Sequence, residues 1–182
     1  DGGARHAIAL GKVPSVVIGD LDSLADGDRR LLESLEVRFL QHPRDKNETD
    51  LELALQHAQG LGISNILLIG ALGGRLDHAL GNLSVLSDPA LAGFDVRADD
   101  GQEEVFFCRE SVGIRGQKGD TVSLLPWGQM VRGVRTSGLR WQLSGETLYP
   151  HKTRGISNEL MGEFAEVQIA FGLLLIVHRR KS

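Results

Sequence analysis

Cysteine, clustered basic residues and long apolar runs are scarce in this chain of 182 residues, and each scarcity excludes a class of protein. The single cysteine, Cys108, cannot form an internal disulfide, so we expect a reducing, cytoplasmic setting rather than a secreted disulfide scaffold. Because Cys108 follows Val105-Phe106-Phe107, we expect it to be a buried strand residue. No apolar run approaches the roughly 20 residues that a membrane-spanning helix needs, so no membrane partner is predicted.

Basic residues are too few and too scattered to predict nucleic-acid binding. The chain has 20 Lys and Arg against 24 Asp and Glu, a formal charge of −4, and its one basic cluster is Arg179-Arg180-Lys181. Nonspecific binding to nucleic acid needs clustered cations, so we do not expect it here. The chain also lacks a Gly-x-x-x-x-Gly-Lys-Ser/Thr phosphate loop, a Gly-x-Ser-x-Gly elbow and histidines at metal-ligand spacing. A bound nucleotide would have to be held by metal, glycine backbone and scattered cations.

The first half of the chain has the pattern of an α/β domain. Up to about Ala98, short apolar runs alternate with segments of helical spacing, which predicts βαβ units and a mostly parallel sheet. Helices are expected at 50–60 and 75–87, and Thr49-Asp50-Leu51-Glu52 has the form of a capping box that opens the first of them. The opening Asp1-Gly2-Gly3-Ala4 usually follows a strand, so we expect this domain to lack its first strand and helix.

The second half has a different pattern. After the tight-turn signal Asp99-Asp100-Gly101, short strand-like runs follow one another at 104–108, 121–125, 131–135, 139–143, 165–170 and 172–178. Gly, Pro or Asp separates most of them, which is typical of an all-β sandwich. We therefore predict a Rossmann-like α/β domain over residues 1–98 and a β-sandwich over residues 99–182.

Four aspartates follow apolar runs in the first half, and they are the strongest chemical signal. Asp20 and Asp22 follow Val16–Ile18, Asp50 follows the run at 37–40, and Asp77 follows the run at 66–69. If these runs are neighbouring parallel strands, the carboxylates meet at the edge where open α/β sheets bind ligands. Carboxylates gathered there repel one another unless a cation such as Mg²⁺ lies among them, and Mg²⁺ accepts such oxygens together with phosphates. The pattern indicates a metal-assisted, phosphate-handling enzyme.

Each of these signals also has a structural interpretation. Asp22 or Ser23 could cap the following helix, and Asp50 lies in a first turn where the helix dipole favours any acid. Gly73 and Gly74 would let a backbone approach phosphate, and the helix after them would attract an anion. Two basic residues, Lys46 and Arg75, are equally interpretable as phosphate partners or as solvated charges.

Aromatic and polar residues of the second half are also open to two interpretations. Trp141 alternates with Leu139 and Leu143, so periodicity alone predicts a strand whose core face carries Trp141. Ser157-Asn158 reads as a polar turn.

Five short motifs occur in an order that closely resembles the thiamine pyrophosphokinase family. They are Gly19-Asp20-Leu21-Asp22-Ser23, Glu48-Thr49-Asp50, Gly73-Gly74-Arg75-Leu76-Asp77-His78, Thr136-Ser137-Gly138-Leu139-Arg140-Trp141 and Gly155-Ile156-Ser157-Asn158-Glu159. The resemblance covers nearly the whole chain. It implies an α/β catalytic domain followed by a β-sandwich, and a homodimer with thiamine sites between subunits. The implied reaction transfers the pyrophosphoryl group of ATP to thiamine, with Mg²⁺ as cofactor and thiamine diphosphate and AMP as products.

The resemblance also implies roles for individual residues. It matches Asp20, Asp22, Asp50 and Asp77 to catalytic acidic positions, the first three of them metal ligands. Phosphate binding falls to Lys46, Thr49, Gly73, Gly74 and Arg75, although the roles of Lys46 and Arg5 stay open. Thiamine binding falls to Ser137, Trp141, Ser157 and Asn158, which replaces the core interpretation of Trp141.

Two alternative functions fit parts of the pattern. A related pyrophosphokinase acting on a pterin alcohol could share the aspartates but would not need Trp141 or Ser157-Asn158. A non-catalytic thiamine or nucleotide sensor could use the same scaffold, but it would not need four carboxylates, because binding thiamine alone requires no metal cage.

Overall fold

The computed structural model describes residues 2–181 and divides into two compact units between Ile63 and Ser64. The first unit contains α1 (Gly3–Ala9), β1 (Val16–Gly19), α2 (Asp26–Ser34), β2 (Arg38–Gln41) and α3 (Asp50–Gly60). Strands β1 and β2 pair in parallel, as predicted, with Val17 opposite Phe39. Together with the helices they enclose a small apolar core made of Ala4, Val17, Leu21, Leu24, Leu32 and Val37.

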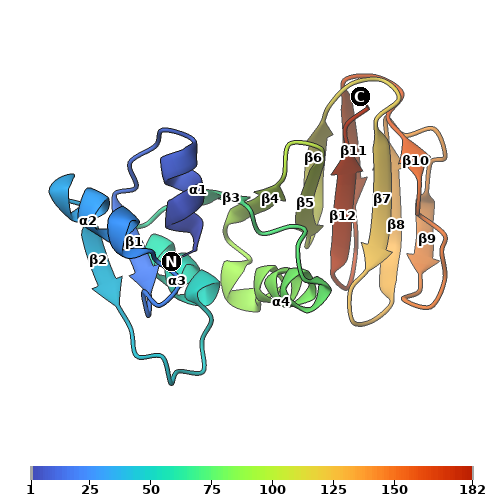
Figure 1. The fold of residues 1–182 in the computed structure, drawn as a ribbon. Helices are drawn as coiled ribbons and strands as arrows, with labels where there is room; N and C mark the ends of the chain where they lie inside the picture. Colours follow the sequence, from blue (N-terminus) through green and yellow to red (C-terminus); the bar gives the residue numbers. More distant parts are fainter. Residues whose placement is uncertain (1, 182) are drawn as a thin grey trace. The chain divides into compact units, whose positions relative to one another are not determined.

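The second unit is built mainly of strands (Figure 1). Its elements are β3 (Asn65–Ile69), α4 (Leu76–Leu86), the 3₁₀ helix η1 (Pro89–Leu91), β4 (Asp95–Asp99), β5 (Glu103–Cys108), β6 (Ser111–Arg115), β7 (Thr121–Pro126), β8 (Val131–Ser137), β9 (Ser144–Leu148), β10 (Asn158–Glu159), β11 (Phe164–Gln168) and β12 (Leu174–Arg179). A six-stranded sheet has the order β10-β7-β12-β5-β4-β3, and a four-stranded sheet has the order β6-β11-β8-β9. Only β3 and β4 pair in parallel within the six-stranded sheet.

The two sheets of the second unit share one hydrophobic core. Phe106, Leu124 and Ile176 of the six-stranded sheet belong to the same buried cluster as Ile114 and Val167 of the four-stranded sheet. In β7 and β11, one strand from each sheet, buried positions alternate with more exposed ones, so one face of each sheet is apolar and must be covered by the other. Cys108 is buried in β5, as expected, and burial raises the pKa of its thiol to about 12.

The turn signal at Asp99-Asp100-Gly101 lies inside the six-stranded sheet. It joins β4 to β5, which are antiparallel neighbours, and the carboxylate of Asp99 accepts the Gly101 amide at 2.7 Å. The Arg180 guanidinium holds the same carboxylate through two hydrogen bonds of 2.9 and 2.6 Å. The predicted domain boundary near residue 99 stays a prediction, because compact units of a structure need not coincide with the domains of a family.

Two sequence expectations about strands need correction. The apolar runs that precede the aspartates fall in two sheets, since β1 pairs with β2 in the first unit whereas β3 pairs with β4 in the second.

Residues 139–143 form no strand: Leu139 makes one isolated bridge to Leu160, and the next strand begins at Ser144. Gly138 ends β8 at a φ of +74°, and a β-carbon there would collide with the carbonyl oxygen of Phe164. The chain therefore turns before the alternation of residues 139–143 can act as a strand pattern.

The two helices predicted with bounds, at 50–60 and 75–87, are found as α3 and α4 to within a residue at each end. The capping box of α3 is present, because the Thr49 hydroxyl accepts the Glu52 amide at 3.3 Å and the Glu52 carboxylate accepts the Thr49 amide at 2.7 Å. Across residues 2–181, no helix combines the length and the apolar character that crossing a membrane requires.

Candidate functional site

The loop after β1 presents Asp20 and Asp22 on either side of a buried leucine. Leu21 has a φ of +67° and is 7% exposed, so its side chain enters the core of the first unit. A left-handed leucine is strained, and such strain persists only where surrounding packing maintains it. The Asp20 carboxylate accepts the Asp22 amide at 3.1 Å, which closes a tight turn between the two aspartates. Ala25 stands at the N-cap of α2, so neither Asp22 nor Ser23 caps that helix.

Lys46 interacts with three of the predicted aspartates, with Asp50 through a hydrogen bond and with Asp20 and Asp22 through their charges. Its ammonium donates to Asp50 Oδ1 at 2.8 Å, and its side chain is 13% exposed. The hydrogen bond to Asp50 raises the pKa of Lys46, and the charges of Asp50, Asp20 and Asp22 act in the same direction. Burial of the Asp50 carboxyl opposes its ionisation, but its charged hydrogen-bond partners, Lys46 among them, hold the pKa of Asp50 below its ordinary value. All three acids therefore act on one cation.

Asp20, Asp22 and Asp50, called the acidic cluster below, have side chains that suit a hard divalent cation. Carboxylate oxygens are ligands that Mg²⁺ prefers, and the charges of all three acids already raise the pKa of the Lys46 ammonium. In residues 2–181, however, no three Asp, Glu, His or Cys side chains are gathered closely enough to form a ready metal cage. Asp22 instead makes a 3.4 Å ion pair with Arg44. The residues fit Mg²⁺ by ligand type, and side-chain rearrangement would have to bring them together.

In the second unit, a glycine-rich loop leads from β3 into α4. Gly73 and Gly74 have φ values of +83° and +69°, and a β-carbon at either would meet no atom within 4 Å. Glycine is therefore needed for backbone conformation and not for a close approach. Asn82 of α4 fixes this loop by donating to the Ala71 carbonyl at 2.8 Å.

Arg75 and Asp77 form a bidentate ion pair at the start of α4. Nε and Nη2 of Arg75 lie 3.1 and 2.6 Å from the two carboxylate oxygens of Asp77. The arginine, with help from the His78 amide, lowers the pKa of Asp77, so this carboxyl is ionised at neutral pH. Both side chains are largely exposed, at 72% and 64%, and could exchange this pairing for a ligand. Asp77 belongs to the second unit, whereas Asp20, Asp22 and Asp50 belong to the first.

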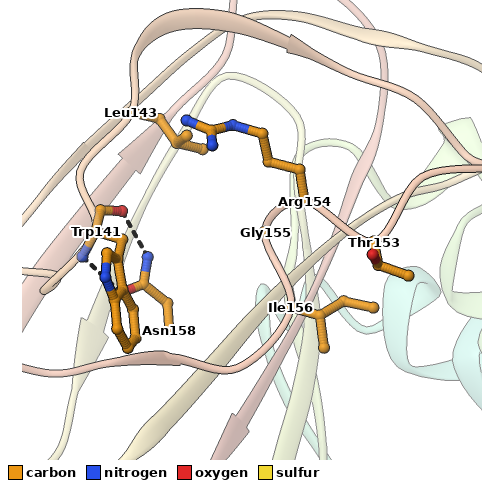
Figure 2. A pocket seen from close by; sticks show the side chains of 7 residues that line it. All are labelled: Trp141, Leu143, Thr153, Arg154, Gly155, Ile156 and Asn158. Carbon is orange, nitrogen blue, oxygen red and sulfur yellow. Dashed lines mark hydrogen bonds between the residues drawn. The ribbon is translucent and has the colours of Figure 1, made fainter.

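A pocket of about 230 Å³ opens between the segment after β8 and the segment before β10 (Figure 2). It is lined by Trp141, Leu143, Thr153, Arg154, Gly155, Ile156 and Asn158. Trp141 and Asn158 lie on one side and Thr153 and Ile156 on the other, which leaves a slot between an indole and an aliphatic side chain. Trp141 is 52% exposed, so the core interpretation from periodicity is wrong, whereas its neighbours Leu139 and Leu143 are buried.

Trp141 is tied to Asn158 through its backbone. Its amide donates to Asn158 Oδ1 at 3.0 Å, and its carbonyl accepts from Asn158 Nδ2 at 2.7 Å. The guanidinium of Arg140 lies 4.8 Å from the centroid of the indole, a cation–π contact that covers part of the ring. Arg140 in turn pairs with Glu159 at 3.0 Å.

The wall opposite Trp141 is held against β7. The Gly155 carbonyl accepts the Leu124 amide at 2.9 Å, and a β-carbon at Gly155 would lie 2.7 Å from the Leu124 carbonyl oxygen. Ser157 follows with a φ of +59°, and its amide donates to the Ser123 hydroxyl at 3.1 Å. Arg154 is balanced by a 3.2 Å ion pair with Glu146.

The pocket contains some of the predicted thiamine-binding residues and several that the sequence did not indicate. Trp141 and Asn158 line it, and Ser157 lies between two lining residues, whereas Ser137 is not among the residues that line it. Sequence reasoning missed Leu143, Thr153, Arg154, Gly155 and Ile156 as lining residues. Gly155 and Ile156 stand next to Ser157-Asn158 in one motif, and that adjacency was the available signal. Arg154 and Thr153 carry no signal in the sequence.

Two family descriptions match this chain along most of its length. Residues 1–117 match "Thiamin pyrophosphokinase, catalytic domain", and residues 109–174 match "Thiamin pyrophosphokinase, vitamin B1 binding domain". The first match contains the acidic cluster and the glycine-rich loop, and the second contains the pocket with Trp141 and Asn158.

Individual relatives agree with this. The chain is 27% identical to thiamine pyrophosphokinase from Bacillus subtilis over 179 aligned residues. The alignment covers 97% of this chain and 84% of that protein. It is 30% identical over 144 residues to thiamine pyrophosphokinase 1 from Oryza sativa, covering 74% of this chain and 54% of the rice protein. A crystal structure of thiamine pyrophosphokinase from Bacillus subtilis superimposes with a TM-score of 0.89 at 25% identity, over 100% of this chain and 86% of the other. On these matches, the chain belongs to the thiamin pyrophosphokinase family.

Proposed function

We propose that this protein is a thiamine pyrophosphokinase, which transfers the pyrophosphoryl group of ATP to the primary hydroxyl of thiamine and releases thiamine diphosphate and AMP. The observation that carries the proposal is the pair of family matches, catalytic over residues 1–117 and vitamin B1-binding over residues 109–174. The relatives named above are thiamine pyrophosphokinases. A slot with an indole on one side suits a flat cationic ligand such as thiamine, because a cation gains energy against an aromatic face.

We assign the ATP phosphates to the acidic cluster and the glycine-rich loop. Asp20, Asp22 and Asp50 would hold Mg²⁺, which when bound supplies positive charge to neutralise the phosphates. Lys46 would exchange part of its interaction with Asp50 for a phosphate oxygen, with the neighbouring Thr49 as a further phosphate contact. For ligands of this kind, catalysis is mostly positioning and electrostatic stabilisation.

The loop before α4 would bind the same phosphates from its own unit. Gly73 and Gly74 leave their backbone amides uncovered by side chains, and the start of α4 favours an anion. Arg75 would turn from Asp77 to a phosphate oxygen. That exchange frees the Asp77 carboxylate, so Asp77 or Asp50 is available to accept the proton of the thiamine hydroxyl.

We assign thiamine to the pocket around Trp141, with Ser137, Ser157 and Asn158 as its polar residues. The inferred assembly is a homodimer in which one subunit's residues 1–98, a Rossmann-like catalytic domain, complete the thiamine site on the other subunit's β-sandwich, residues 99–182. Support for this assembly comes from the family resemblance of the motifs. A cytoplasmic setting belongs to the same proposal, because one buried cysteine is what a reducing compartment permits.

Substrate dependence tests the proposal. Purified protein is incubated with ATP and Mg²⁺ together with thiamine, with a hydroxymethyl pterin, or with neither, and ATP consumption is followed. Consumption that requires thiamine is the expected result. Consumption that requires the pterin would make the protein a different pyrophosphokinase, and thiamine binding without consumption would make it a sensor.

A further inference from the structure

We propose that Asn158 is a positioning residue for Trp141, and that it acts on thiamine through the indole instead of through a contact of its own. This rests on the proposed function, because it assumes that Trp141 stacks on the substrate. It departs from the family resemblance, which places Asn158 among the direct thiamine contacts.

The hydrogen-bonding capacity of Asn158 is almost fully used inside the protein. Its carboxamide oxygen accepts from the amides of Trp141 at 3.0 Å and Glu159 at 2.9 Å, and its nitrogen donates to the Trp141 carbonyl at 2.7 Å. An asparagine side chain offers two acceptor sites and two donors, so a single N–H remains. The residue is also only 5% exposed. A residue with one donor left and little accessible surface is poorly equipped to recognise a ligand directly.

The orientation of this carboxamide is set by the backbone that it binds. The amide of Trp141 requires an acceptor and its carbonyl requires a donor, so the oxygen and nitrogen of Asn158 cannot exchange places without losing both bonds. Asn158 thus closes a two-point clamp on one residue of an irregular segment.

Trp141 needs such a clamp because no strand holds it. The segment from Gly138 to Leu143 lies between β8 and β9, and other backbone hydrogen bonds hold it at neighbouring residues. The Gly138 carbonyl accepts the Met161 amide at 2.9 Å, and the Arg140 amide donates to the Glu159 carbonyl at 2.9 Å. The Leu143 amide donates to the Thr136 hydroxyl at 2.9 Å, and its carbonyl accepts the Thr136 amide at 3.0 Å. At Trp141 itself, the two backbone bonds to Asn158 orient the residue whose ring is half exposed at the pocket. Without them, the cation–π contact with Arg140 remains at the ring, but the backbone that carries the indole would have to be ordered when the ligand binds, and that ordering costs affinity.

The test compares three variants that carry Trp127→Phe, so that Trp141 is the remaining tryptophan. Asn158→Ala removes the clamp. Asn158→Asp keeps the shape and the acceptors but sets a carboxylate oxygen against the Trp141 carbonyl. Ile114→Val is the control. Ile114 is fully buried in the hydrophobic core that also contains Leu139 and Leu143, and it does not line the pocket. The substitution loosens the fold without touching the clamp.

Three readouts are expected to move together in the two Asn158 variants. Tryptophan fluorescence anisotropy falls and emission shifts to the red in the absence of any ligand. The KM for thiamine rises about three- to tenfold, the range expected for ordering one side chain on binding, and the KM for ATP is unchanged. Adding Trp141→Ala to Asn158→Asp leaves the thiamine KM where Trp141→Ala alone puts it, because residues that act through one contact are not additive. None of these changes is expected in Ile114→Val.

Three results would overturn the inference. A higher thiamine KM with unchanged fluorescence, or effects of Asn158→Asp and Trp141→Ala that simply multiply, would make Asn158 a direct contact. Unchanged fluorescence and unchanged KM in both Asn158 variants would leave it no role at the pocket. Failure of the proposed function is separable, because the fluorescence readout needs no thiamine: a clamp that holds Trp141 in a protein with no thiamine activity would refute the function and keep the clamp.

Discussion

Individual carboxylates carry most of the chemistry proposed for this protein, and Asp22 is the simplest to test. Asp22→Asn should reduce turnover by several orders of magnitude, because it would remove one of the ligands proposed for the Mg²⁺ that would neutralise the phosphates. Asp26→Asn is a matched control, since Asp26 is an exposed carboxylate in the first turn of α2 in the same unit. Both variants should keep the circular dichroism of the parent. Near-normal turnover of Asp22→Asn at saturating Mg²⁺ would remove Asp22 from the site.

A second residue-scale feature lies away from the pocket. His178 of β12 is 1% exposed, with Nε2 2.9 Å from an Asp120 carboxylate oxygen and Nδ1 3.6 Å from Glu104 Oε2, the latter an ion-pair distance and not a hydrogen bond. The carboxylates of Glu104 and Asp120 raise the pKa of His178 above its ordinary value, although burial opposes them. The folded state therefore holds the proton more tightly than the unfolded state, and protonation of His178 stabilises the fold.

This linkage predicts the pH dependence of stability. The contribution of His178 is complete below the unfolded pKa of about 6.5 and is lost as the pH rises through the higher pKa of the folded state. Melting temperatures measured from about pH 6 to pH 9 should therefore fall in the parent and fall less in His178→Gln. His151→Gln, a change at an exposed histidine, should follow the parent. Parallel curves for the parent and His178→Gln would show that folding does not raise the pKa of His178.

At the scale of elements, the wall of the pocket depends on one close backbone approach. Gly155 has a φ of +102°, and an added β-carbon would lie 2.7 Å from the Leu124 carbonyl oxygen of β7. Gly155→Ala should destabilise the protein by about 1–3 kcal/mol, through backbone strain and displacement from the sheet. Gly162→Ala is the control, because its β-carbon would meet nothing within 4 Å and its φ is not positive. Thermal unfolding of both variants measures the difference, and equal melting temperatures would contradict it.

Elements differ in how far the sequence could predict them. The capping box at Thr49 and the helices α3 and α4 were predictable, because they depend on local spacing and on side chains a few residues apart. Leu139 and Leu143 are buried as their spacing indicates, but the strand between them was wrong, because Gly138 turns the chain for a tertiary reason: the backbone of Phe164 leaves no room for a β-carbon.

The candidate site shows the same limit. The aspartate motifs could be recognised from residue type and order. The contact between Lys46 and Asp50 was less predictable, because Lys46 lies in the loop before α3, where the helical i, i+4 rule does not apply. The clamp between Trp141 and Asn158 joins residues 17 positions apart. It binds the Asn158 side chain to the backbone amide and carbonyl of Trp141, and backbone groups carry no signal in the sequence. Family resemblance named both residues, and only the structure indicates how one acts on the other.

For the whole molecule, the proposed homodimer predicts that defects in different parts of the chain can complement each other. Asp50→Asn is expected to be inactive, and Trp141→Ala to show little activity when thiamine is held far below its raised KM. Unfolding and refolding them together should restore part of the activity, because an isologous dimer has two equivalent sites and a mixed dimer places both lesions in one of them. Each variant refolded alone is the control. Mixed dimers that form, as shown by affinity tags, but stay inactive would mean that each site is built from a single chain.

The fate of the ATP phosphates tests the central claim most directly. Purified protein, ATP, Mg²⁺ and thiamine are incubated and followed by phosphorus NMR. Attack of the thiamine hydroxyl on the β-phosphorus should produce thiamine diphosphate and AMP in equal amounts, at the expense of ATP and with no ADP. Formation of ADP with thiamine monophosphate, or of no phosphorylated thiamine at all, would contradict the assignment of this chain as a thiamine pyrophosphokinase.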